Sequence, residues 1–183
     1  MKQFALFIFA FTALILQAKE NEAHHHDHGS HVHGAATVNI AFDGLIGRIE
    51  FKAAANGVVG FEHEAISKKD KATLVEVDDK FIAGRKEIFK FDPSLECAIE
   101  KVTIGLSVEN KSTTNKGKTK VSPEHGDYTA NYNVICKKSP LGSKLILDFT
   151  QFKSLKDIDA TLLIGDLQKS IEIKNKPVTV ELK

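Results

Sequence analysis

The stretch Thr37-Val38-Asn39-Ile40-Ala41-Phe42-Asp43-Gly44 indicates the fold class, because its residues alternate in character up to a turn-forming Asp-Gly pair. Such alternation is typical of a β-strand that buries one face and exposes the other. The pattern resumes after the turn, with Ile49 and Phe51 on one side and charged residues between and around them. The two strands are predicted to form a hairpin.

Similar patterns along the rest of the chain predict about seven strands in all. The further runs lie at residues 98–108, 128–134, 145–149, 162–164, 171–173 and 178–182. Hairpins with one buried face favour antiparallel pairing over a parallel sheet, whose strands would be continuously apolar. In residues 98–108 we expect Val102, Ile104, Leu106 and Val108 to face one way.

One helix is predicted after Ser67, which can cap it, with Asp70 placed three residues later for a capping box. Its apolar face carries Leu74, Val77 and Phe81, and Gly84 is the expected stop. Residues 53–66 are expected to form a loop and a short strand, and residues 110–120 a solvated loop. The predicted class is therefore α+β, rich in β-structure, with mostly antiparallel sheets and one main helix.

A weak internal repeat is also present. Residues 33–40 align with residues 125–132, and His, Gly, Thr and Asn recur at the same four of the eight positions. The fold can accordingly be two pseudo-repeated halves, with chance similarity as the alternative. A true duplication would place His33 and His125 at the same structural point of each half.

The first residues resemble a secretory signal peptide. A short cationic start precedes an apolar run at residues 4–16, which is too short for a bilayer that takes about 20 apolar residues, and small Ala18 follows. The alternative is a membrane anchor or a buried helix. We expect a signal peptide at residues 1–18, a flexible His-rich segment at 19–34 and a β-rich domain at 35–183, exported to the periplasm, without stable membrane insertion once the signal is removed.

The two cysteines, Cys97 and Cys136, fit an exported protein. In an oxidising compartment two such thiols usually form a structural disulfide. On the chain-entropy model, closing this loop would stabilise the fold by roughly 4 kcal/mol. A catalytic dithiol would more typically have C-x-x-C spacing, and a zinc ion held by both thiols is the other alternative.

Histidine is distributed unevenly, since six of the eight histidines lie within residues 24–33. Neutral imidazole is the commonest protein ligand for Zn²⁺ and also suits Cu²⁺ and Ni²⁺. The candidate ligands in this segment are His24, His25, His26, His28, His31 and His33. His31 and His33 form the more specific pair, because residues two apart in an extended chain point to the same side. An affinity tag or a solubilising segment is the alternative.

Two further histidines lie beside carboxylates. His63 follows Glu62 and precedes Glu64, and His125 lies two residues before Asp127. A nearby carboxylate can bind a metal directly or accept a hydrogen bond from the second ring nitrogen of a ligating histidine. His63, His125, Glu62 and Asp127 therefore join the candidate zinc ligands, although ordinary surface histidines fit the same pattern.

Other classes of function find less support. Lysine plus arginine (25) nearly balance aspartate plus glutamate (24), which gives no electrostatic footprint for nucleic acid. The chain lacks H-E-x-x-H, G-x-S-x-G and a glycine-rich phosphate loop, so no enzyme is expected. The alternatives are a zinc-dependent hydrolase with Glu62 or Glu64 as general base, a copper- or nickel-handling protein, and an adhesion module with incidental histidines.

Several short motifs occur together in a characteristic order. They are His31-Val32-His33-Gly34, Asn39-Ile40-Ala41-Phe42-Asp43-Gly44, Gly60-Phe61-Glu62-His63, Cys97 and the run from His125 to Cys136. The combination resembles the zinc-regulated periplasmic proteins of the ZrgA family. The resemblance implies a zinc-binding protein that assists zinc uptake by an ABC importer. Members usually carry a long His/Asp/Glu-rich insert between the two cysteine-bearing strands, but residues 110–120 contain no histidine.

Overall fold

The computed structural model describes residues 34–115 and 118–183, with the side chains of residues 109–124 left out. All of these residues belong to the second of two units, which spans residues 31–183. The expected signal peptide at residues 1–18 and the six histidines of residues 24–33 lie outside the described residues. Within the described part, no helix is long and apolar enough to cross a membrane.

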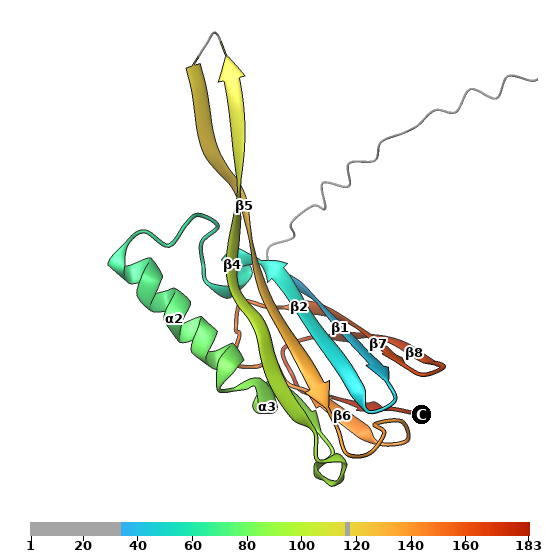
Figure 1. The fold of residues 1–183 in the computed structure, drawn as a ribbon. Coiled ribbons are helices and arrows are strands. Elements are labelled where there is room, and N and C mark those ends of the chain that lie inside the picture. Colours follow the sequence, from blue (N-terminus) through green and yellow to red (C-terminus); the bar gives the residue numbers. More distant parts are fainter. Residues whose placement is uncertain (1–33, 116–117) are drawn as a thin grey trace, which may run out of the picture. The chain divides into compact units, whose positions relative to one another are not determined.

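A six-stranded sheet with the order β4-β5-β2-β1-β7-β8 forms the body of this unit (Figure 1). Its strands are β1 (Ala35–Asp43), β2 (Ile46–Ala54), β4 (Ala98–Asn115), β5 (Lys118–Ile135), β7 (Asp157–Ile164) and β8 (Leu167–Ile173). All neighbouring pairs are antiparallel except β1 and β7, which are parallel. The β-rich α+β prediction with mostly antiparallel pairing is confirmed.

Smaller elements cover one face of this sheet. A three-stranded antiparallel sheet has the order β3-β6-β9 and consists of β3 (Phe89–Phe91), β6 (Lys144–Leu147) and β9 (Val178–Glu181). The helices are α1 (Ala55–Val58), α2 (Lys68–Ile82), α3 (Arg85–Ile88) and the 3₁₀ turn η1 (Pro93–Leu95). The main helix, α2, lies alongside β4 (Figure 1).

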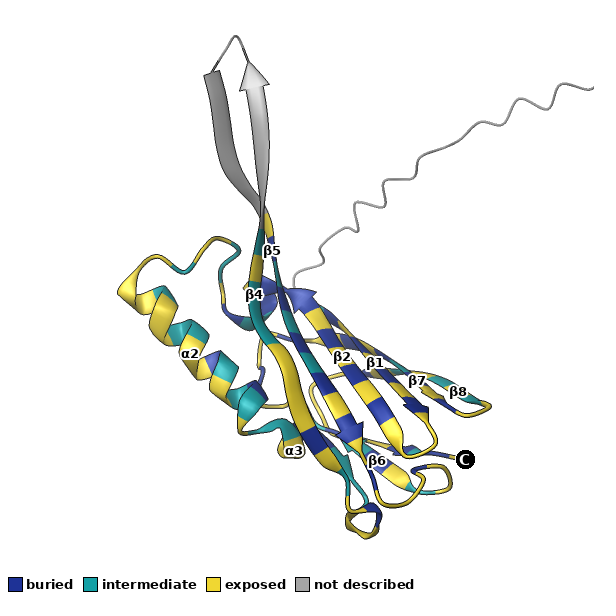
Figure 2. Ribbon diagram, viewed as in Figure 1, coloured by how far each residue is buried: buried dark blue, intermediate teal, exposed yellow. Residues whose placement is uncertain are grey.

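The predicted first hairpin is confirmed. Gly44 has φ +60° at the turn, and Val38 of β1 pairs with Phe51 of β2. Buried and exposed residues alternate along both strands, as the banding of Figure 2 shows. One face of the sheet is therefore apolar and covered, while the other carries charged and polar residues in solvent.

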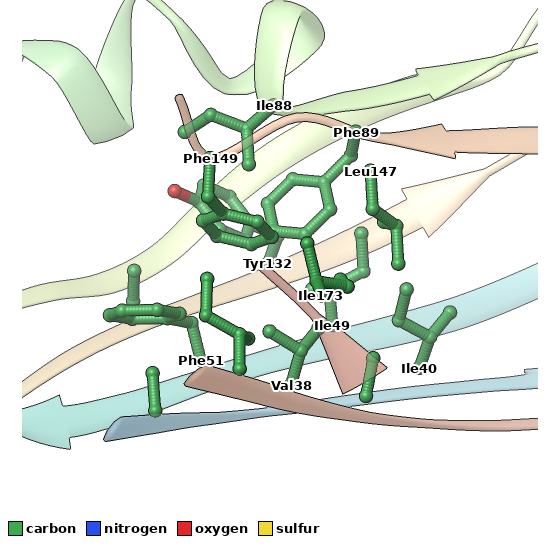
Figure 3. Close-up of a cluster of buried hydrophobic side chains, with 14 of the residues drawn as sticks. Val38, Ile40, Ile49, Phe51, Ile88, Phe89, Tyr132, Leu147, Phe149 and Ile173 are labelled. Carbon is green, nitrogen blue, oxygen red and sulfur yellow. The ribbon is translucent and has the colours of Figure 1, made fainter. Parts of the chain in front are cut away.

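The core lies between the covered face of the large sheet and the smaller elements (Figure 3). Val38, Ile40, Ile49 and Phe51 approach it from the large sheet, and Ile88, Phe89, Leu147 and Phe149 approach it from the opposite side. Among its aromatic contacts, the Phe51 ring lies 4.9 Å from that of Phe81 on α2. Burial of these side chains is the main term that holds the two layers together.

Two tyrosines of β5 tie α2 to the sheet. The hydroxyl of Tyr132 donates a hydrogen bond to the carbonyl of Phe81 at 2.8 Å, and that of Tyr128 donates to Asp78 at 2.6 Å. Phenols are protonated at neutral pH and so can donate, and burial raises the pKa of both hydroxyls further. At its other end, α2 begins with the predicted capping box of Ser67 and Asp70.

Three local predictions are wrong. Residues 53–66 contain no strand beyond the end of β2 at Ala54, because the chain turns into α1 and then an irregular segment. Residues 110–120 are not a loop, since β4 and β5 continue through most of them up to the pair Asn115 and Lys118. Val102 does not share the face of Ile104, because a bulge between Lys101 and Thr103 leaves it 50% exposed.

Cys97 and Cys136, the two cysteines of the chain, form the predicted disulfide. The bond joins the segment before β4 to the residue just after β5, at the ends of two strands that already pair with each other. Cys136 is buried in the core cluster. The alternative in which both thiols bind zinc is therefore excluded in this state of the chain.

Candidate metal centre

The candidate site lies at the end of the large sheet where β1 begins and β2 ends. Ala36 of β1 pairs with Ala53 of β2, and Ala53 pairs with Tyr128 of β5. The residues just before Tyr128 therefore lie level with the start of β1, on the far side of β2. We call this end of the sheet, formed by residues 34–36, 53–62 and 125–128, the rim.

Helix α1 packs against Gly34, just before β1, and against β5, on the two sides of β2. A Cβ on Gly57 would lie 3.2 Å from the backbone nitrogen of Gly34, and a Cβ on Gly126 would lie 3.2 Å from Cβ of Ala55 and 2.9 Å from the carbonyl oxygen of Glu62. The contact at Gly126 leaves no room for a larger side chain, and that at Gly57 leaves little. Gly34 is also held by hydrogen bonds from the amides of Lys156 and Asp157 to its carbonyl.

The rim brings His125 and Glu62 together although they are far apart in sequence. Nδ1 of His125 lies 3.6 Å from Oε2 of Glu62, with the imidazole half exposed and the carboxylate 23% exposed. This separation is slightly longer than a hydrogen bond, and a small movement would let the carboxylate accept a hydrogen bond from Nδ1–H, which leaves the lone pair on Nε2. This arrangement of carboxylate and imidazole is the one that commonly supports a metal-ligating histidine.

Asp127 lies on the next outward-facing position of β5 after His125. Its Oδ2 lies 2.8 Å from Nζ of Lys52 on β2, and its side chain is 22% exposed. Sequence patterning selected Asp127 as a candidate ligand but missed Lys52, because the alternation of β2 assigns this lysine only to the solvent face. The cross-strand register is the signal that links the two residues.

His63 lies on the irregular segment after α1, exposed and stacked on Phe61 with ring centroids 5.0 Å apart. Its Nδ1 lies 2.9 Å from the carbonyl oxygen of Glu64, which can only accept, so Nδ1 carries the proton. Nε2 of this exposed ring then carries the lone pair and can act as an acceptor. The geometry connects His63 to Glu64, not to the pair formed by His125 and Glu62.

The described residues do not form a complete metal site by themselves. Within them, no three histidine, cysteine, aspartate or glutamate side chains lie close enough together to hold a metal ion. The remaining candidates, His24, His25, His26, His28, His31 and His33, lie outside the described residues. The last of them immediately precedes Gly34, which is anchored at the rim.

The fold and the rim together define a β-rich scaffold that gathers imidazole and carboxylate groups, the donor types that Zn²⁺ accepts, at one end of a sheet. The family model for the ZrgA family zinc uptake protein matches residues 30–182. The chain therefore belongs to the ZrgA family of zinc uptake proteins, which is not an enzyme family. A search of curated proteins finds no significant match.

Proposed function

We propose that this protein captures Zn²⁺ in the periplasm through a site at the rim and supplies it to an ABC importer. Membership of a zinc uptake family supports the role in uptake. The location of the site at the rim is supported by the distance of 3.6 Å between His125 and Glu62. This pair lies at the end of the sheet where β1 begins, shortly after the histidine-rich segment in the sequence.

In this proposal, Nε2 of His125 binds the metal while Glu62 holds the ring through Nδ1. Zn²⁺ takes about four ligands at roughly 2 Å in a tetrahedral arrangement. Asp127 offers an oxygen from the same face of β5, two residues away. The rim thus contributes one nitrogen and one carboxylate oxygen, and the coordination shell needs further imidazoles.

His33 and His31 are the proposed sources of those imidazoles. Both histidines shortly precede Gly34, whose carbonyl is held at the rim, and Ala36 and Tyr128 pair with the same residue of β2, so β1 enters the sheet at the end where His125 lies. Strands on either side of a third are about 10 Å apart, which two imidazoles facing one ion can span. His24, His25, His26 and His28 are proposed to collect zinc less specifically, because ordering a flexible segment costs conformational entropy.

His63 is proposed as an auxiliary binding point. The hydrogen bond of its Nδ1 to the carbonyl of Glu64 fixes the tautomer in which Nε2 can accept a metal. Glu64 and Asp70 carry negative charge nearby, and the pKa of Asp70 is lowered chiefly by its hydrogen bonds with Ser67 and further by His63. A single imidazole on an exposed segment binds zinc weakly.

Zinc titration of residues 19–183 tests this proposal. His125→Ala is expected to weaken the tightest zinc site by about 10- to 100-fold, because it removes a ligand held by a rigid strand. His63→Ala is the matched control, since it also removes one exposed histidine next to a glutamate, and it should change the affinity by less than about three-fold. Equal effects of the two substitutions would count against the rim. Parallel titrations with Cu²⁺ and Ni²⁺ determine the selectivity.

The cellular part of the proposal has its own test. Residues 1–18 are proposed to be a signal peptide and residues 35–183 the folded domain, with zinc handed to an importer outside the cytoplasm. Fractionation of cells that make the full chain should recover it in the periplasm without residues 1–18. Recovery of uncleaved protein in the membrane fraction would contradict the proposed export.

A further inference from the structure

The ammonium group of Lys52 lies within the ligand cluster proposed above. Its Nζ is 2.8 Å from Oδ2 of Asp127, at ion-pair distance. Lys52 is on β2 opposite Thr129, and Asp127 is opposite Ala54, so the lysine reaches diagonally across the open face toward the rim. The lysine side chain is 59% exposed, whereas the carboxylate is only 22% exposed.

A lysine in this position has two effects on a metal ion at the rim. It occupies a carboxylate oxygen that could otherwise bind the metal, and its positive charge repels the divalent cation. This repulsion between like charges is weakened by dissolved salt, because the lysine is exposed to solvent. The exposed lysine chain can swing into solvent, so the metal can displace it.

We propose that Lys52 is a built-in competitor of zinc, which neutralises Asp127 in the metal-free protein and leaves when zinc binds. This inference rests on the proposed rim site and adds a determinant of its affinity. The consequence is a site that binds zinc more weakly, and releases it faster, than its ligands alone would allow. A protein that passes its metal to an acceptor needs such a limit on affinity.

The test is a zinc titration of residues 19–183 carrying Lys52→Gln. The substitution keeps most of the chain length but removes the charge, and it is expected to raise zinc affinity about three- to ten-fold at low ionic strength. The gain should fall below about two-fold near 0.5 M salt, because the Debye length shrinks to a few ångströms. Lys52→Arg keeps the charge and should bind zinc as the unmodified chain does.

Lys90→Gln is the matched control. Lys90 also forms an ion pair with an aspartate, Asp148, at 3.0 Å, and that carboxylate is 18% exposed. The pair lies at β3, away from the rim, so its loss should leave zinc affinity unchanged. A rise in affinity in both variants would show a general effect of net charge and would overturn the inference.

A double-mutant cycle with Asp127→Asn identifies the mechanism. If Lys52 acts by competing for this carboxylate, the gain from Lys52→Gln should shrink by at least half in the Asp127→Asn background. Unchanged or weaker zinc binding by Lys52→Gln, while His125→Ala still weakens it, would overturn the role of Lys52 and leave the rim site intact. If His125→Ala has no effect either, the rim site itself is wrong.

Discussion

Val38 of β1 and Ala130 of β5 pair with the same residue of β2, Phe51, from opposite sides. In the aligned segments, residues 36–40 of β1 and 128–132 of β5 therefore run parallel to each other at the same height in the sheet. Residues that align with each other in the sequence are therefore also the residues that pair with the same position of β2. This equivalence brings Gly34 and Gly126 to the same helix, α1, and defines the rim.

The histidines nearest the sheet should matter most for zinc. Replacing His31 and His33 by alanine is expected to weaken zinc binding more than replacing His24 and His25, because the former pair lies next to the anchored Gly34. Calorimetric titration of the two double mutants measures the difference. Equal losses would show that the segment acts as an unstructured collector of metal.

Glu62 should act through His125. Glu62→Gln keeps the shape of the side chain but weakens its hold on Nδ1, and it is expected to lower zinc affinity by about ten-fold. Glu64→Gln is the control, because the contact of Glu64 with His63 is through its backbone carbonyl. The prediction fails if both glutamine variants bind zinc equally well.

The hydroxyl of Tyr132 should stabilise the fold and not the site. Tyr132→Phe leaves the carbonyl of Phe81 without this donor in a buried place, and we expect a loss of about 1–3 kcal/mol in the free energy of unfolding. Urea denaturation measures this loss. Zinc affinity should stay the same, and a joint loss of stability and affinity would mean that α2 positions the rim.

The disulfide should contribute more than any single hydrogen bond. Cys97 and Cys136 close a loop with a sequence separation of 39, for which the chain-entropy model gives roughly 4 kcal/mol. Replacing both by serine should lower the free energy of unfolding by about this amount under non-reducing conditions. A loss well below 1 kcal/mol would show that the unfolded chain is already restricted by other means.

The Asp148 carboxylate makes the free energy of unfolding depend on pH in the acid range. The Thr150 hydroxyl and then Lys90 hold the pKa of this carboxyl below its ordinary value. Because the folded pKa is depressed, the contribution is complete above the unfolded value of about 3.9 and disappears as the pH falls through the folded value. Asp148→Asn should therefore flatten the stability curve below about pH 4. An unchanged acid limb in thermal denaturation would contradict this.

Local patterns in the sequence predict the local structure well. The hairpin of β1 and β2, the capping box at Ser67 and Asp70, and the pairing of Cys97 with Cys136 all follow from spacing and residue type. Each depends on interactions that a short stretch of chain, or a unique pair of residues, determines. The family resemblance could also be stated from the order of the motifs, and the match of the family model to residues 30–182 confirms it.

Long-range pairings could not be predicted in the same way. Alternation shows that β1 and β7 are strands but does not show that they are parallel neighbours. The continuation of β4 and β5 is hidden because a two-stranded ribbon beyond the end of β2 needs no apolar alternation. At the rim, the sequence selects His125 and Glu62 separately, and only the fold brings them within 3.6 Å and adds Lys52.

The most direct test of the rim is the position of the metal itself. A crystal structure of residues 19–183 with one equivalent of Zn²⁺, with anomalous scattering measured on both sides of the zinc absorption edge, locates the ion. The account predicts one strong peak about 2 Å from Nε2 of His125, with imidazoles of the preceding segment completing the shell. A fully occupied zinc ion elsewhere, with no metal at His125, would contradict it.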